Sequence, residues 1–162
     1  MINSYIFEGK NLEDNLNNKL NELNLKKEDV FIKIDEIEGK LFKSKKYKFK
    51  IFLKNDILLY IKDYLKEVSK LSGIPMNIEI REKDEIINIM IASENSSIMI
   101  GKDGRTINSL ELLLKNSLKN LTDMNIKIIL DSSNYKYNKL KKFEKNIKYI
   151  AKEVLKTKID SK

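Results

Sequence analysis

Histidine and cysteine are both missing from this chain of 162 residues. Their absence excludes imidazole and thiolate metal sites, and it excludes every Ser-His or Cys-His nucleophile pair. A disulfide framework is excluded as well, which fits a reducing compartment. The carboxylates show no spacing typical of a metal-binding loop, and no phosphate-binding Gly-Lys-Ser/Thr element is present. We therefore expect a protein that is not an enzyme and has no catalytic residue, metal site or cofactor.

Long hydrophobic runs are also missing. No apolar run approaches the roughly 20 residues that span a bilayer, and the first ten residues are not followed by the apolar region of a secretory signal. These absences predict a cytoplasmic protein without stable membrane insertion. The apolar fraction of 41% is nevertheless close to that of folded proteins, so the chain can form one ordinary domain or two small ones.

Arginine is scarce, with two residues against 30 lysines, but the net charge is still +8. The excess is segregated: residues 40–54 and 136–162 each carry +7, whereas residues 1–39 carry −4 and residues 55–135 carry −2. A lysine-rich composition that reflects an AT-rich genome would scatter these charges along the chain. The segregation favours a functional basic surface, and a polyanion is the partner that such a surface attracts.

The first third of the sequence predicts a small β-α-β-β domain over residues 1–54. Residues 4–8 and 30–34 have the composition of short strands. Asn11 is expected to cap a helix between them, because acidic residues follow in what would be its first turn. The apolar face of this helix is spaced by three and four residues and consists of Leu12, Leu16, Leu20 and Leu23.

A further strand at residues 46–54 alternates apolar residues with lysines. Successive side chains of a strand point to opposite faces, so the alternation predicts one buried face and one basic face. The secondary basic contacts that we expect for a nucleic acid are Lys43, Lys45, Lys46 and Lys48. The same pattern also fits a solvated outer face or an edge strand protected by charge, and the sequence leaves these alternatives open.

Residues 55–134 predict a second domain with the element order α-β-β-α-α-β. A helical stripe begins at Ile57, and its helix ends at Ser72-Gly73-Ile74-Pro75. Two antiparallel strands follow at residues 76–81 and 87–91. The remaining elements are a short helix over residues 95–100, a longer helix with apolar positions from Ile107 to Leu121, and a strand over residues 126–130.

The segment Gly101-Lys102-Asp103-Gly104 lies between the last two helices of this second domain. In KH domains a tight Gly-x-x-Gly turn lets the backbone approach phosphates, while the flanking helices form a groove for about four nucleotides. Glycines suit the turn because a Cβ atom would block the approach or forbid the required φ. The amides and the positive dipole end of the following helix add attraction for anions.

The candidate nucleic-acid-binding residues are this loop and its neighbours. Lys102 and Arg105 would supply positive charge at the turn. Asp103 favours a purely structural helix-turn-helix instead, because a carboxylate repels a phosphate backbone. The place of the loop in the α-β-β-α-α-β order still favours contact with single-stranded RNA. The full set of candidates is Ile100, Gly101, Lys102, Asp103, Gly104, Arg105 and Ile107.

Three segments resemble the Jag family of bacterial RNA-binding proteins, which is also called KhpB. Residues 5–14 resemble the opening of its Jag domain, residues 100–110 its KH loop and helix, and residues 131–136 the Asp-x-x-x-Tyr junction before its C-terminal domain. The resemblance implies an α+β protein: a β-α-β-β Jag domain, a type II KH domain and a C-terminal helix over residues 135–162. It also implies post-transcriptional regulation or an RNA-chaperone role, linked to envelope growth and division, and a second small KH protein as partner.

The sequence departs from the family in three places. The Gly-Phe-Leu-Gly turn of the Jag domain is replaced by Gly39-Lys40-Leu41-Phe42-Lys43, and Asp103 stands where KH loops often carry a basic residue. The arginine and histidine signature of the C-terminal domain is missing, since the chain has no histidine. We interpret residues 135–162 as a truncated or decayed remnant of that domain.

The last segment predicts an amphipathic helix whose apolar stripe consists of Leu140, Phe143, Ile147, Ile150 and Val154. An isolated helix of this length is marginal in water. We therefore expect the stripe to be buried, either against the preceding domains or against the same helix in a homodimer. Three functions compete with RNA binding: a protein-protein interaction scaffold that uses the KH fold, a helix on an anionic membrane surface, and an enzyme. The scaffold is the main alternative.

Overall fold

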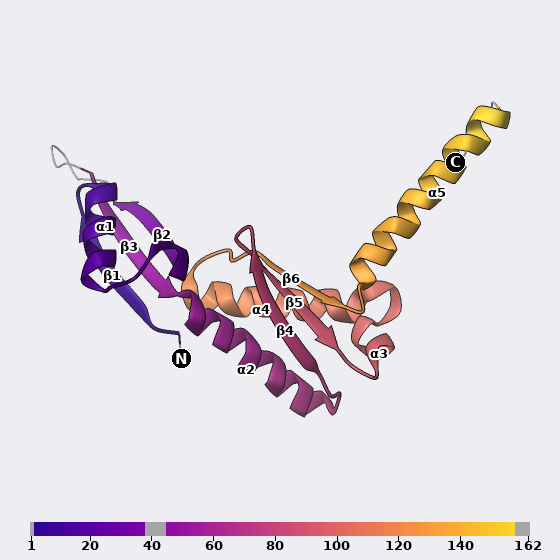
Figure 1. Cartoon of the computed structure of the whole chain (residues 1–162), viewed down its shortest axis with the longest axis horizontal. Coiled ribbons are helices and arrows are strands. Elements are labelled where there is room, and N and C mark those ends of the chain that lie inside the picture. The colour runs from indigo at the N-terminus through magenta and orange to yellow at the C-terminus, as the bar shows by residue number, and fades with distance from the viewer. Residues whose placement is uncertain (1, 38–44, 158–162) are drawn as a thin grey trace. The chain divides into compact units, whose positions relative to one another are not determined.

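The computed structural model describes residues 2–37 and 45–157. The chain divides into two compact units, one made of Met1–Ser72 with Leu113–Ile126 and the other of Gly73–Leu112 with Lys127–Lys162. One long helix therefore contributes residues to both units (Figure 1). The boundaries expected from the sequence, which separate residues 1–54, 55–134 and 135–162, stay a prediction.

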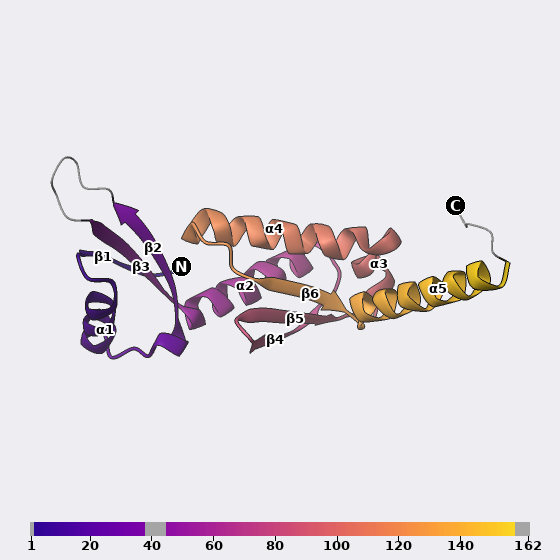
Figure 2. The ribbon, with the colours of Figure 1, turned by 90° about the horizontal axis from the view of Figure 1, so that it is seen from above.

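The N-terminal residues form the expected β-α-β-β arrangement. Strand β1 (Ser4–Gly9) leads into helix α1 (Leu12–Glu22), a 3-10 turn (Lys27–Asp29), strand β2 (Val30–Ile37) and strand β3 (Lys46–Leu53). The sheet has the order β1-β3-β2, and both strand pairs are antiparallel. Helix α1 packs on this sheet (Figures 1 and 2), and the core between them consists of Leu16, Leu20, Val30, Phe49 and Ile51.

The start of α1 follows from its capping residue. Asn11 has extended backbone angles, and its side-chain oxygen accepts a hydrogen bond from the Asp14 amide at 3.5 Å. This bond satisfies one of the amides that a helix leaves unpaired in its first turn, so the predicted cap is confirmed. Leu16 and Leu20 of the predicted stripe are buried, whereas Leu12 in the first turn is exposed.

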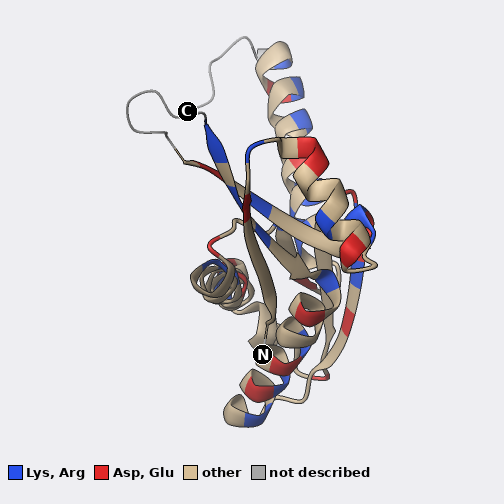
Figure 3. Cartoon of the chain, turned by 90° about the vertical axis from the view of Figure 1, so that its left-hand side faces the viewer, with Lys and Arg blue, Asp and Glu red and all other residues tan. Residues whose placement is uncertain are grey.

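Strand β3 lies in the middle of the sheet, which excludes the alternative of an edge strand protected by charge. Phe49 and Ile51 are fully buried, and Phe7 of β1 stacks on Phe49 with 4.7 Å between ring centroids. Figure 3 shows that basic and acidic positions are interspersed on this sheet. In the strand register Lys48 lies between Glu8 of β1 and Asp35 of β2, whereas Lys50 lies opposite Lys33.

Helix α2 (Lys54–Ser72) buries the predicted stripe, with Ile57, Ile61 and Leu65 fully inaccessible. It ends as expected, because Gly73 adopts a φ of +68°, the left-handed conformation that favours glycine after a helix C-terminus. Tyr60 of α2 and Ser117 share a hydrogen bond between their hydroxyl groups. Within the described residues, no helix has the length and hydrophobicity that crossing a membrane requires.

The second unit contains a three-stranded sheet with the order β4-β5-β6. Strands β4 (Asn77–Lys83) and β5 (Ile86–Ala92) form an antiparallel hairpin, whose turn residues both have positive φ, as type I′ turns require. Strand β6 (Ile128–Ser132) pairs with β5 in parallel. The apolar residues that alternate along β5 and β6 are buried, and they are Ile87, Ile89, Ile91, Ile128 and Leu130.

Parallel strands need a crossover connection, and here it carries the candidate loop. From β5 the chain passes through α3 (Ser96–Ile100), a 3-10 turn (Lys102–Gly104) and α4 (Arg105–Thr122) before it reaches β6 (Figure 1). The α+β class and the predicted order α-β-β-α-α-β are confirmed. Helix α4 buries Ile107, Leu110, Leu114 and Leu118, whereas Leu121 near its end is exposed.

Helix α5 (Tyr135–Thr157) forms where the sequence predicts it, but its apolar stripe is not covered by the other described residues of its own unit. Leu140, Phe143, Ile147 and Ile150 are 48–61% exposed. Only the first turns of α5 lie beside the connection between α3 and α4 (Figures 1 and 2). The rest of its own unit therefore does not bury the stripe, and burial against the N-terminal unit or against a second copy stays a prediction.

Candidate nucleic-acid interface

The Gly-x-x-Gly segment forms a tight turn with three residues in the left-handed region. The φ angles are +69° at Gly101, +57° at Asp103 and +82° at Gly104. The Gly104 amide donates a hydrogen bond to the Gly101 carbonyl at 3.2 Å, which closes the turn. Aspartate is among the few residue types besides glycine that tolerate this conformation. Asp103 therefore has a structural reason to stand in the loop.

Both glycines are also required by their surroundings. A Cβ atom on Gly101 would lie 2.1 Å from Oγ1 of Thr106, and one on Gly104 would lie 2.5 Å from Cε1 of Tyr135. Neither position can accept a side chain unless its neighbour moves. The loop backbone thus comes closer to its surroundings than any larger residue would allow.

Apolar residues on both sides hold the turn in place. Met99 in α3 and Ile107 in α4 are 2% and 0% exposed, and Ile100 is half-buried. Because Ile107 is inaccessible, it anchors the first turn of α4 in the core beneath the loop. Ile100 and Ile107, which flank the loop in the sequence, therefore help to hold it in place.

The positive charge of the loop is available to a ligand. Lys102 and Arg105 are both exposed. Neither side chain forms a hydrogen bond or an ion pair with another residue in the described part of the chain. An anion that approaches the N-terminus of α4 would meet these two cations together with the positive end of the helix dipole.

The first turns of α5 contact the loop. The Tyr135 ring lies against Gly104, and Lys139 Nζ donates a hydrogen bond to the Asp103 carbonyl at 2.8 Å. The same Nζ lies 5.5 Å from the centre of the Tyr135 ring. Sequence reasoning missed this contact, because nothing in the spacing of the residues predicts which side chain covers Gly104.

The start of α5 is itself fixed by hydrogen bonds. Asp131 Oδ1 accepts hydrogen bonds from the amides of Ser132 and Lys136 at 2.8 and 3.2 Å. The Lys136 side chain forms an ion pair with Glu111 of α4, and Glu111 also accepts a hydrogen bond from the Leu130 amide at 2.8 Å. Asp131 and Tyr135 of the Asp-x-x-x-Tyr junction therefore both hold α5 against the loop.

The secondary basic contacts expected from the sequence lie in the other compact unit. Lys43 falls outside the described residues. Lys45 Nζ lies 2.6 Å from Glu36, and the hydrogen bond to that carboxylate raises the pKa of Lys45. Lys46 lies 3.9 Å from Glu8, and Lys48 is half-buried. These acidic partners reduce the positive charge that the block presents to a phosphate.

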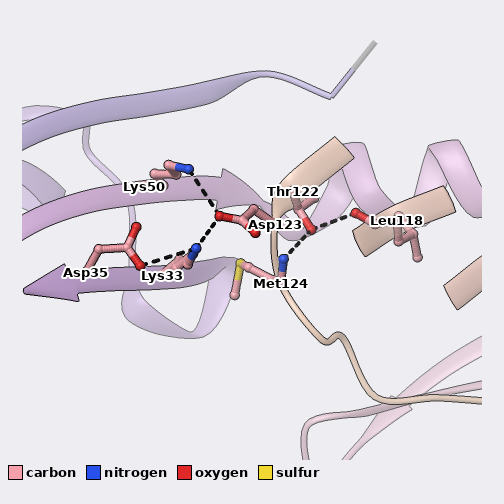
Figure 4. Close-up of polar contacts among 7 residues, drawn as sticks. All are labelled: Lys33, Asp35, Lys50, Leu118, Thr122, Asp123 and Met124. Atoms are coloured by element: carbon pink, nitrogen blue, oxygen red, sulfur yellow. Dashed lines mark hydrogen bonds and ion pairs between the residues drawn. The ribbon is translucent and has the colours of Figure 1, made fainter. Parts of the chain in front are cut away.

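A second group of paired charges lies where the end of α4 meets the N-terminal sheet (Figure 4). Lys33 forms an ion pair with Asp123, and Lys50 lies 3.6 Å from the same carboxylate. Asp35 lies 3.2 Å from Lys33. The hydrogen bond between Lys33 and Asp123 raises the pKa of the lysine and lowers that of the aspartate. These lysines are therefore paired with carboxylates of their own unit.

Comparison with known proteins identifies the second domain. A family model described as the KH domain of KhpA and KhpB matches residues 59–130, which include the whole candidate loop. The RNA-binding protein KhpB of Bacillus subtilis (strain 168) is 27% identical over 154 residues, covering 93% of this chain and 74% of the relative. The matched segment is a KH domain of the KhpA and KhpB type. The RNA-binding protein KhpB of Clostridium symbiosum is 28% identical over 86 residues, which cover 53% of this chain and 39% of that relative.

The match to the KH-domain model and the similarity to proteins named KhpB confirm the resemblance noted from the sequence. These relatives are named for RNA binding, and neither name describes a catalytic activity. In the part of the chain that the structure describes, no group of three or more acidic residues could hold a metal ion. The turn at residues 101–104 lies inside the segment that matches the KH-domain model.

Proposed function

We propose that this protein binds single-stranded RNA through the turn at residues 101–104 and acts as a post-transcriptional regulator or RNA chaperone in the cytoplasm. The observation that carries the proposal is the turn itself. It combines two glycines that are closely packed against neighbouring side chains with two exposed cations, Lys102 and Arg105, inside a KH domain of the KhpA and KhpB type. Relatives named for RNA binding support the choice of ligand.

The physical basis of binding is close approach. The glycines keep the turn tight against Thr106 and Tyr135, and a phosphate can approach the backbone amides at the start of α4. Lys102 and Arg105 then neutralise the phosphate charge, while bases splayed from the strand lie between the flanking helices. Asp103 opposes this attraction, but its left-handed backbone and its carbonyl bond to Lys139 shape the turn. Duplex RNA should bind more weakly, because a KH groove recognises unstacked bases.

Salt dependence tests the proposal directly. If the turn and nearby lysines contact about five phosphates, log affinity should fall with log salt concentration at a slope near −3.5, from about −0.7 per contact to a single strand. Fluorescence anisotropy with a labelled single strand measures this slope. Affinity that stays constant between low and moderate salt would show that phosphates are not engaged.

A charge-reversal variant distinguishes RNA binding at the turn from RNA binding elsewhere on the surface. Lys102→Glu places a second carboxylate beside Asp103, so binding at the turn should be lost while the fold is kept. Lys62→Glu on α2 makes the same charge change at another exposed position and should bind like wild type apart from a small general loss. If the two variants bind equally well, the turn has only a structural role.

A protein-protein interaction scaffold is the second candidate, and the exposed apolar stripe of α5 favours it. The partner that we propose for this role is a second small KH protein. Light scattering of an equimolar mixture measures the association. A stable complex whose mass drops in Phe143→Asp, combined with no RNA binding, would favour the scaffold.

A further inference from the structure

A groove of about 470 Å³ lies between the first turn of α4 and the first half of α5. Asn108 of α4 lines one side, and the other side includes Lys139, Lys142, Phe143 and Asn146 of α5. Its volume is within the range of about 300–1,000 Å³ that ligand pockets occupy. All of these residues belong to the same compact unit as the Gly-x-x-Gly turn.

The groove begins at the turn. Lys139 lines it and also donates its hydrogen bond to the carbonyl of Asp103 at 2.8 Å. Because a carbonyl carries no net charge, this bond fixes the position of the lysine without neutralising it. A strand that leaves the turn on this side would meet the Lys139 ammonium group first.

The lining of the groove has the chemistry of a site for single-stranded nucleic acid. Phe143 is 61% exposed, and an accessible aromatic ring is a surface on which a base stacks. The side-chain amides of Asn108 and Asn146 carry both donors and acceptors for base edges. Lys142 is exposed and can reach a phosphate.

The charge of α5 selects the class of ligand. The helix carries eight lysines and two glutamates, a net charge of +6. A second copy of the same helix would bring another +6 to the apolar face, and this repulsion opposes a seam between copies. A polyanion is attracted by the same charge.

We propose that the RNA strand held at the Gly-x-x-Gly turn continues into this groove, where Phe143 stacks on a base and Lys139 and Lys142 contact phosphates. The inference rests on the proposed function, because the turn supplies the first contacts of the strand. It assigns the loop-proximal half of α5 to RNA binding and gives its exposed aromatic residue a role.

The test compares oligoadenylates of four and eight nucleotides, since the turn and its helices hold about four nucleotides. For the wild-type full-length chain, the longer strand should bind more tightly, by about fivefold to a hundredfold if one base stacks on Phe143. In Phe143→Ala the longer strand should lose most of this advantage, because only its additional phosphate contacts would then favour it. In Lys142→Ser the salt slope for the longer strand should be shallower by about 0.7.

Matched controls lie on the same helix beyond the groove. Leu155→Ala removes an apolar side chain that is 80% exposed, and Lys152→Ser removes an exposed lysine. Both should leave the affinity ratio and the salt slope near their wild-type values. Phe143 and Lys142 are exposed, so their variants should unfold at the wild-type temperature, which a thermal melt checks.

Each outcome has a clear meaning. A reduced length gain in Phe143→Ala but not in Leu155→Ala supports the groove. Equal length gains in these two variants overturn it while leaving binding at the turn intact. Failure of both oligomers to bind the wild type overturns the proposed function and this inference together. A drop in oligomer mass in Phe143→Ala, with RNA binding unchanged, would assign the face to contacts between copies and overturn the inference.

Discussion

Replacement of Gly104 by alanine should destabilise the protein more than the same change at any glycine with open surroundings. Gly104 is buried, has a φ of +82°, and faces Tyr135 so closely that a new Cβ atom would lie 2.5 Å from Cε1 of the ring. Alanine at this position therefore meets two penalties. The left-handed backbone strains the residue itself, and the methyl group pushes the tyrosine away from the loop.

The two penalties can be separated because Gly73 provides a matched control. It has a φ of +68°, and a Cβ atom there would have no neighbour within 4 Å. Gly73→Ala should therefore cost only the strain of the backbone, about 1–2 kcal/mol. Gly104→Ala adds the displacement of a packed ring, for which overpacking suggests about 1–3 kcal/mol more. Alanine restricts the unfolded chain more than glycine does, and this effect offsets part of the loss of stability by the same amount in both variants.

Urea denaturation of the two single variants measures the difference in the free energy of unfolding. A double-mutant cycle between Gly104→Ala and Tyr135→Ala then isolates the contact, because removal of the ring should restore part of the loss caused by the alanine. Equal losses in Gly73→Ala and Gly104→Ala would refute the reasoning. Additive effects of Gly104→Ala and Tyr135→Ala would also refute it, since they would show that the ring does not restrict the loop.

Two further predictions concern single carboxylates. Asp103→Asn keeps a residue that tolerates positive φ but removes a negative charge from the loop, so RNA affinity should rise by up to about fivefold at low salt, as anisotropy can measure. A weaker or unchanged affinity would mean that phosphates do not pass near this side chain. Asp123→Asn should lower the melting temperature at pH 6, because Asp123 has a lowered pKa through its bond to Lys33. The aspartate contributes stability above its unfolded pKa of about 3.9, and this contribution is lost as pH falls through the lower folded pKa. The difference between variant and wild type should thus shrink in acid and in high salt, and a difference that does not change as the pH falls below the unfolded pKa would contradict the role of the charge.

Local patterns were sufficient to predict the secondary structure and the position of the loop. Alternation along β3 and β5, the cap at Asn11 and the helix end at Gly73 each depend on neighbouring residues only, so the sequence reveals them directly. The α-β-β-α-α-β order then placed residues 101–104 between two helices. Family resemblance added the type of domain that this order forms.

Contacts between distant residues could not be predicted in the same way. Periodicity shows that α5 has an apolar face, but it does not show what covers that face, and the structure leaves Phe143 exposed. Alternating lysines predicted a basic face on β3, but not the acidic partners of Lys45 and Lys46. The contact of Tyr135 with Gly104 joins residues that are far apart in the sequence. Such contacts are set by the tertiary fold.

The parallel pairing of β5 with β6 has a consequence for folding kinetics. The register joins Ile87 to Ile128, so about 40 residues separate the two partners along the chain. Closing so long a connection costs chain entropy before the pairing can compensate for it, and contacts of this kind slow folding. The Gly-x-x-Gly turn lies inside the connection, so its formation belongs to the step that closes the sheet. Changes that strain the turn should therefore slow refolding as well as weaken RNA binding.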